Sequence, residues 1–185
     1  MSSYLYSQKP DVIQCNAFGS ATGSFVEYIY IDENNYTYAV GMSGGCWMSK
    51  GFCTYLNESY DTIWYRRLGQ FIYSIRRYDA IFNSNMLFIA GTQMANINNV
   101  THFDRVLVKI STSGDTLFNH VSGTDVNECF STVKVLHDKT ILVAGYAFFE
   151  DTERSFLFKF DNNGNILWSK IYDKYPKQHI NSIDI

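Results

Sequence analysis

The sequence predicts an all-β fold built from repeated four-stranded antiparallel units. Tyrosine and phenylalanine, which favour strands, each occur 14 times among the 185 residues. Three apolar runs each end in a glycine, and an anchor residue lies 27 positions before each of these glycines. No segment has a strong helical pattern. A repeat of about 50 residues is the size of one supersecondary unit that stacks on copies of itself.

Two sets of landmark residues define the repeat. The glycines that end the apolar runs are Gly41, Gly91 and Gly145. The anchors that precede them are Gln14, Trp64 and Phe118, and Trp168 is a last anchor with no glycine after it. Successive anchors are 50, 54 and 50 residues apart, and the four extra residues fall between Gly91 and Phe118. We expect this insertion to lengthen a surface loop.

Four short strands are predicted within each unit. The second strand ends at the landmark glycine and is apolar throughout, which indicates burial on both faces. The third strand alternates, so that Phe156, Phe158 and Phe160 share one face and Lys159 points the other way. The fourth strand carries the anchor. The first strand is expected at roughly 28–31, 78–81, 132–135 and 182–185.

A single domain of about three and a half units is predicted over residues 1–185. Stacking would bury the two apolar faces of each unit, and Trp64, Phe118 and Trp168 are expected to act as buried wedges between neighbours. The expected segments are 1–24 for the last two strands of a preceding unit, 25–71, 72–123 and 124–172 for three whole units, and 173–185 for the first strand of a following unit.

The stretch from Phe158 to Tyr172 carries a recognisable pattern. Asp161, Gly164 and Trp168 follow the arrangement Asp-x-x-Gly-x-x-x-Trp. This pattern resembles the blade repeats of surface β-propellers, known as SBBP or delta-60 repeats, and is similar to the tryptophan-docking repeats of quinoprotein-like and BamB-like propellers. The resemblance implies a β-propeller-like array and a cell-surface or secreted location, although no signal peptide is visible. It carries over no active site.

Two arrangements remain open for such an array. In the first, the chain is an incomplete ring of roughly six to eight blades, completed by another copy or by additional blades. In the second, four units close into one ring by mixing the two ends of the chain. Both arrangements leave Ile180 to Ile185 as an apolar edge strand that would pair with a partner.

Composition argues against several partners and cofactors. The net charge of −3 provides no basic stripe for nucleic acid, and no apolar segment reaches the roughly 18 residues of a membrane span. The four cysteines and four histidines lack the paired spacing of a zinc site, so neither a metal nor a cofactor is expected. Cys46 and Cys53 are interpreted as buried thiols, with a disulfide between them as the alternative.

Residues that break the repeat are the candidates for a ligand site. Trp47 lies in the connection after the first apolar run, and Asp79 replaces an apolar residue on a predicted first strand. His102, Tyr146 and Phe149 lie in the equivalent connections of later units, where they are expected to form a rim on one face. Each also has an ordinary structural interpretation, such as a loop aromatic folded back on its own unit.

The leading functional hypothesis is a non-catalytic binding or scaffolding module that recognises a protein or a glycan. No nucleophile and base occur in a catalytic spacing. The alternatives are a lectin and part of a propeller enzyme, either glycosidase- or sialidase-like or a quinone-dependent dehydrogenase. A glycosidase needs two carboxylates facing each other across a cleft, and Asp79, Asp125 and Asp184 are candidates only by default.

Overall fold

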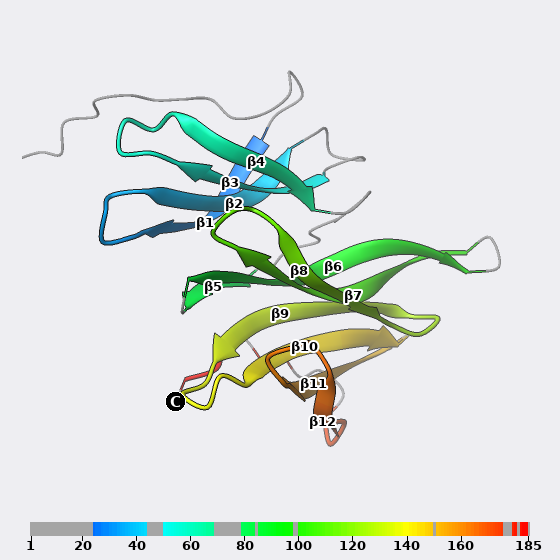
Figure 1. Ribbon diagram of the computed structural model, residues 1–185. Coiled ribbons are helices and arrows are strands. Elements are labelled where there is room, and N and C mark those ends of the chain that lie inside the picture. The colour runs from blue at the N-terminus through cyan, green and yellow to red at the C-terminus, as the bar shows by residue number, and fades with distance from the viewer. Residues whose placement is uncertain are drawn as a thin grey trace, which may run out of the picture.

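The computed structural model describes residues 24–43, 50–68, 79–83, 85–97, 100–149, 151–175, 179–180 and 182–184. These residues form an all-β structure of three four-stranded antiparallel sheets, with no helix in the described ranges. The three sheets are stacked in chain order (Figure 1). In each sheet every strand pairs with the next strand along the chain, as the repeat predicts.

Each sheet is formed by four consecutive strands. Sheet 1 contains β1 (Ser24–Ile31), β2 (Thr37–Ser43), β3 (Lys50–Leu56) and β4 (Thr62–Leu68). Sheet 2 contains β5 (Asp79–Asn83), β6 (Met86–Ile97), β7 (Val100–Ser111) and β8 (Thr116–Ser122). Sheet 3 contains β9 (Asn127–Val135), β10 (Ile141–Phe149), β11 (Thr152–Phe160) and β12 (Ile166–Tyr172). The structure differs from the prediction of a last strand at 182–185. Residues 182–184 lie outside any strand, and Ile185 lies outside the described residues.

The insertion between Gly91 and Phe118 is not the loop that its position predicts. Strands β6 and β7 each run for 12 residues and pair without interruption from Met86↔Ser111 to Ile97↔Val100. The hairpin therefore extends beyond the rest of its sheet (Figure 1). Backbone pairing satisfies the N–H and C=O groups of the inserted residues, which an irregular loop would leave to solvent.

The turn between the third and fourth strands is built in the same way in all three sheets. In the turn between β7 and β8, the Gly114 N–H donates to the Ser111 carbonyl and the Ser111 N–H donates to the Asp115 carbonyl. Gly114 has a φ of 85° and the equivalent Gly164 one of 87°, in the left-handed region that favours glycine. Tyr60 occupies this position in sheet 1 with a φ of 62°, so its turn keeps the same shape with a side chain attached.

A β-bulge precedes each anchor. The pairing of β3 with β4 skips Ile63, that of β7 with β8 skips Leu117, and that of β11 with β12 skips Leu167. A bulge places two residues of one strand opposite one residue of its partner and increases the local twist. The repeated bulge thus orients the following aromatic side chain in the same way in all three sheets.

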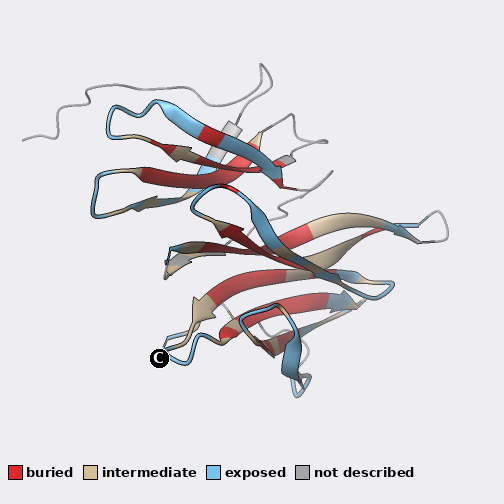
Figure 2. Cartoon of the chain, in the orientation of Figure 1, coloured by how far each residue is buried: buried red, intermediate tan, exposed pale blue. Residues whose placement is uncertain are grey.

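Two hydrophobic cores lie between the three sheets. The first contains Tyr38, Val40, Cys53 and Trp64 from sheet 1, packed on the β6 and β7 side chains Leu87, Ile89, Val106, Val108 and Ile110. The second joins Phe88, Ala90 and Leu107 of sheet 2 to sheet 3, including Phe130, Phe156, Phe158 and Phe160. Buried residues therefore concentrate in the central parts of the strands, whereas the turns are exposed (Figure 2). Strand β5 lies against both β1 and β9.

Each core is closed by an anchor that lies on a turn glycine of the next sheet. A Cβ on Gly114 would lie 2.9 Å from the Trp64 ring, and a Cβ on Gly164 would lie 2.9 Å from the Phe118 ring. Trp64 is 9% exposed and Phe118 is half-buried. Trp168 differs from the predicted buried wedge, because 43% of its surface is exposed. The described residues place no glycine turn against it.

Close packing also explains the landmark glycine of sheet 3. Gly145 lies on β10 next to the position where its pairing with β9 is irregular. A Cβ on Gly145 would lie 1.9 Å from the Cys129 carbonyl oxygen and 2.6 Å from the Phe156 ring. Any side chain at this position would push β9 away from β10. Gly41 and Gly91 hold the same place on the buried parts of β2 and β6.

Candidate functional site

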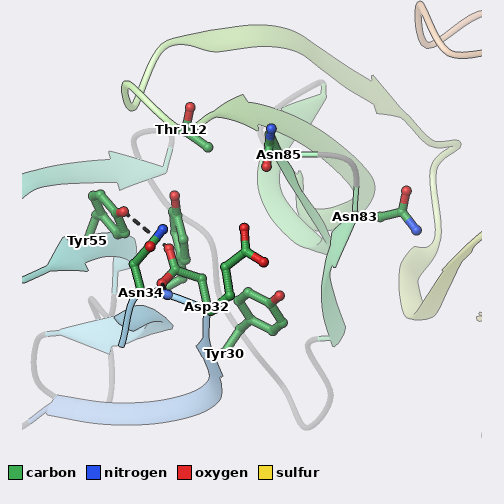
Figure 3. A pocket seen from close by; sticks show the side chains of 9 residues that line it. Tyr30, Asp32, Asn34, Tyr55, Asn83, Asn85 and Thr112 are labelled. Atoms are coloured by element: carbon green, nitrogen blue, oxygen red, sulfur yellow. Dashed lines mark hydrogen bonds between the residues drawn. The ribbon is translucent and has the colours of Figure 1, made fainter. Parts of the chain in front are cut away.

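An open polar groove of about 590 Å³ lies where the turns of sheets 1 and 2 meet. It is formed at the end of the sheets that carries the turn between β1 and β2, the turn between β5 and β6, and the turn between β7 and β8 (Figure 3). Sheet 1 contributes Tyr30, Asp32, Glu33, Asn34, Tyr38 and Tyr55, and sheet 2 contributes Asn83, Asn85 and Thr112. We call these nine residues the polar groove.

Asp32 organises one side of the polar groove. Its Oδ1 accepts the backbone N–H groups of Asn34 and Tyr36, each at 2.9 Å, as aspartate does at the start of a turn. Its Oδ2 accepts the Tyr55 hydroxyl at 3.3 Å (Figure 3). With donors at both oxygens, the Asp32 carboxylate holds the turn in shape, and its charge is partly offset within the protein.

Stacked tyrosines form the floor between the two sheets. The rings of Tyr38 and Tyr55 stack with centroids 4.2 Å apart, and Tyr55 also lies 5.9 Å from the Trp64 ring. Burial raises the pKa of Tyr38 above its ordinary value, and the hydrogen bond with Tyr55 raises it further. Burial also raises the pKa of Tyr55. Both phenols are therefore neutral hydrogen-bonding groups across the whole range of ordinary pH.

Four side chains of the polar groove make no hydrogen bond or ion pair with the described part of the chain. They are the Glu33 carboxylate, the Asn34 and Asn85 amides and the Thr112 hydroxyl. Asn34 comes from sheet 1, whereas Asn85 and Thr112 come from sheet 2 and face it across the opening (Figure 3). The groove therefore offers both donors and acceptors to a ligand, from two separate sheets.

The equivalent place between sheets 2 and 3 is closed by a lysine. Lys109 holds the position in β7 that Tyr55 holds in β3, since each lies opposite the anchor of its sheet. The Lys109 ammonium donates to the Asn162 backbone carbonyl at 2.9 Å and to Asn162 Oδ1 at 2.7 Å. It also lies 5.5 Å from the Phe88 ring centroid, and burial lowers its pKa.

A buried charged cluster joins sheets 2 and 3 at their other end. Arg105 of β7 pairs with Glu128 of β9 at 2.8 Å, donates to Ser122 Oγ at 3.1 Å, and lies 4.7 Å from the Phe158 ring centroid. Burial lowers the pKa of Arg105 and raises that of Glu128, although the attraction within the pair opposes both shifts. These contacts cross-link two sheets and fill the space between them, so the cluster is structural.

His102 lies beside this cluster and is not a rim residue. Its side chain is 4% exposed, and Nε2 lies 3.3 Å from Asp104 Oδ1 without hydrogen-bond geometry. The long β6–β7 hairpin accounts for this burial, because His102 pairs with Ala95 inside the hairpin instead of standing in a loop.

The other predicted ligand residues do not meet at one site. Tyr146 is buried on β10, where its ring stacks on His179 at 4.4 Å, and Phe149 at the end of the same strand lies 4.4 Å from the Arg154 guanidinium. Asp79 begins β5, and its backbone pairs with Ala90. The structure describes the backbone of Asp79 and not its side chain. Trp47 lies outside the described residues. None of these residues, nor His102, lines the polar groove.

Sequence reasoning missed the groove residues because it searched for residues that break the repeat, and it singled out none of these. The signal that was present is the polar run from Asp32 to Asn35 together with tyrosine at position 55, where the equivalent strands carry Lys109 and Lys159. Each alone is ordinary turn or strand chemistry. The polar run and Tyr55 together form a groove only because the turns that carry Asn85 and Thr112 lie opposite them in sheet 2.

Two properties of the described residues concern other kinds of site. No His, Cys, Asp and Glu side chains among them gather into a group of three that would hold a metal ion. In the same ranges, no helix is long and apolar enough to cross a membrane.

Comparison of the chain with models of protein families finds no match, and no curated protein compared with it is significantly similar.

Proposed function

We propose that the chain is a non-catalytic binding or scaffolding module of the β-propeller type. The observation that carries the proposal is the repeated lock between neighbouring sheets, in which Trp64 lies on Gly114 and Phe118 lies on Gly164. Such stacking of four-stranded units supports a blade array. The side-by-side order of β1, β5 and β9 supports it as well, because the first strands of propeller blades line a common axis.

The uncovered anchor of sheet 3 supports a partner. Trp168 and its neighbours Ile166, Leu167 and Ile171 on β12 are all exposed large apolar side chains. A large aromatic side chain left exposed where the equivalent side chains are covered marks a candidate interaction site. In the first two sheets the equivalent anchor lies on a turn glycine of the next sheet, so the fitting partner for Trp168 is another blade, from a second copy or from additional blades.

Two described residues beyond β12, His179 and Ile180, contact sheet 3. The Ser131 hydroxyl of β9 lies 3.1 Å from the Ile180 carbonyl oxygen, and the His179 ring stacks on Tyr146 of β10. His179 Nε2 also contacts the Glu153 carboxylate of β11. His179 and Ile180 are therefore held against β9, β10 and β11 of sheet 3. We propose that the segment from Ile180 onward pairs with a partner strand.

Association of the purified chain tests this proposal. Light scattering over a wide concentration range is expected to show association for the wild type and a loss of association for Trp168→Ala. Val100→Ala is the matched control, because Val100 is 61% exposed at the tip of the β6–β7 hairpin. A wild type that remains monomeric throughout, or Trp168→Ala that associates as the wild type does, would contradict the proposed blade pairing.

A further inference from the structure

We propose that the polar groove binds a short, uncharged oligosaccharide. This proposal deepens the binding function proposed above and rests on it. The groove volume of about 590 Å³ falls within the roughly 300–1,000 Å³ of sites for small ligands. Its open side leaves room for a sugar chain to continue beyond the groove.

The unpaired groups of the groove match sugar hydroxyls. A hydroxyl both donates and accepts hydrogen bonds, and a side-chain amide offers donors and an acceptor side by side. One amide therefore pairs with two neighbouring hydroxyls of a sugar ring. The Asn34 and Asn85 amides face the opening from different sheets, with the Thr112 hydroxyl close by (Figure 3).

An aromatic surface is present beside these polar groups. Tyr30 is half-buried and its ring centroid lies 6.3 Å from that of Tyr38. It stands at the edge of the groove next to Asp32 (Figure 3). Ligand sites usually combine aromatic walls with a few well-placed polar groups, and the ring of Tyr30 gives the apolar face of a pyranose a surface to lie on.

The charges of the groove exclude acidic sugars. Its nine lining residues include Asp32 and Glu33 but no lysine or arginine. A carboxylate on the ligand would meet like charge in the groove, which raises its free energy of binding.

The same charges do not select a basic peptide. Asp32 already accepts three donors, and the remaining carboxylate, Glu33, is exposed. An exposed ion pair contributes roughly 0–1 kcal/mol. The amides and the hydroxyl therefore dominate recognition, and these groups fit a neutral polyhydroxylated ligand.

The comparison with the next pair of sheets supports an external occupant. There the Lys109 ammonium occupies the equivalent opening and hydrogen-bonds twice to Asn162. Tyr55, which replaces the lysine in sheet 1, turns its hydroxyl to Asp32 instead. The Thr112 hydroxyl makes no hydrogen bond with the described part of the chain.

The direct test is an NMR titration of the isotopically labelled chain. The probes are neutral trisaccharides of glucose, mannose, galactose and N-acetylglucosamine, an oligouronate of equal length, and a lysine-rich peptide. We expect saturable shifts of the Asn34 and Asn85 side-chain amide signals with at least one neutral trisaccharide and none with the oligouronate. Saturable shifts with the peptide or the oligouronate only, or with no probe, would overturn the proposal.

Variants then locate the binding site. The double variant Asn34→Ala, Asn85→Gly removes both amides, and glycine is chosen because Asn85 has a φ of 61°. Loss of these hydrogen bonds is expected to weaken sugar binding about tenfold or more. Asn163→Ala is the matched control, since Asn163 is an exposed turn asparagine of sheet 3. Unchanged affinity in the double variant would place the sugar elsewhere and contradict the proposal.

The test of sugar binding can fail or succeed independently of the test of blade pairing. Light scattering on the double variant is expected to show the same association as the wild type, because the polar groove lies between sheets 1 and 2 and Trp168 lies on sheet 3. Sugar binding by a chain that stays monomeric would support the groove and contradict only the pairing.

Discussion

The two junctions between the sheets solve the same packing problem with different side chains. Between sheets 1 and 2, the Trp64 ring lies on Gly114, and its indole N–H donates to the Thr112 carbonyl at 2.9 Å. Between sheets 2 and 3, Phe118 lies on Gly164 in the same way but has no N–H, and Lys109 donates to the equivalent carbonyl of Asn162.

The two junctions differ in which side chains fill the space between the sheets and which donate a hydrogen bond to the turn carbonyl. In the first junction one side chain does both, because the indole has an apolar body and a donor. In the second junction a phenyl ring fills the space and a lysine from the neighbouring strand supplies the donor. The two junctions also differ at the surface: the polar groove lies at the first, and at the equivalent place of the second the Lys109 ammonium hydrogen-bonds to Asn162.

The largest expected effect is the loss of Trp64. Trp64→Ala removes a ring that is 9% exposed and leaves the Thr112 carbonyl without its donor, so we expect a loss of about 3–5 kcal/mol in the free energy of unfolding. Phe118→Ala, at a half-buried ring, is expected to cost about 2–3 kcal/mol. Urea unfolding measures both.

The exposed anchor provides the control for this pair. Trp168→Ala is expected to cost only about 1 kcal/mol or less in the isolated chain, because nearly half of the ring is already in solvent. Equal losses for Trp64→Ala and Trp168→Ala would refute the assignment of Trp64 as the lock between sheets 1 and 2.

A smaller effect is expected from the turn glycines that receive the anchors. Gly114→Ala combines a positive φ with a Cβ 2.9 Å from the Trp64 ring, which is tethered by its hydrogen bond, and is expected to cost about 2–4 kcal/mol. Gly164→Ala faces the untethered Phe118 ring and is expected to cost about 1–3 kcal/mol.

Tyr60→Gly is the control for the turn itself, because Tyr60 has the same backbone conformation. This substitution relieves the left-handed strain and is expected to change stability by less than about 1 kcal/mol. Thermal or urea unfolding compares the three variants. A Gly114→Ala variant as stable as the wild type would show that the ring moves aside freely.

Another small effect concerns Cys53, a buried thiol of the first junction. Cys53 is fully buried, and the equivalent residue of sheet 2 is Leu107. Burial raises the pKa of the Cys53 thiol from 9.0 to about 12. Between these values the unfolded chain loses a proton that the folded chain keeps, so stability falls as the pH rises above about 9.

The loss from Cys53 is expected to reach about 1 kcal/mol at pH 10. Unfolding of the wild type and of Cys53→Ala at pH 7 and pH 10 measures it. The wild type should lose more stability than the variant between these two values. If both lose the same amount, Cys53 ionises as easily in the folded chain as in the unfolded one.

The repeat made the sheets predictable from the sequence. Alternation along the third strands correctly grouped Phe156, Phe158 and Phe160 on one face, where they pack against sheet 2. The landmark glycine of sheet 3, Gly145, also marks a position that has no room for a side chain. Periodicity reports which residues share a face, and that information is enough to define units and cores.

The same patterns could not predict features that depend on how two sheets meet. The bulged residues Ile63, Leu117 and Leu167 look like ordinary strand residues, because a bulge changes pairing and not composition. His102 was assigned to a loop since an insertion does not reveal whether its two halves pair. The polar groove requires Asn34 and Asn85 to face each other although they belong to different sheets.

Tyr60 has a consequence for assembly. Each lock has a direction, since an anchor of one sheet is received by the turn glycine of the next, and repeated head-to-tail contacts between copies would generate a ring or an open filament. In sheet 1 the receiving position carries Tyr60, whose Cβ stands where an incoming ring would lie. Growth by repeated head-to-tail addition is therefore disfavoured, and Trp168 is left to a glycine-bearing blade or to a closed two-fold pair of sheet 3 faces.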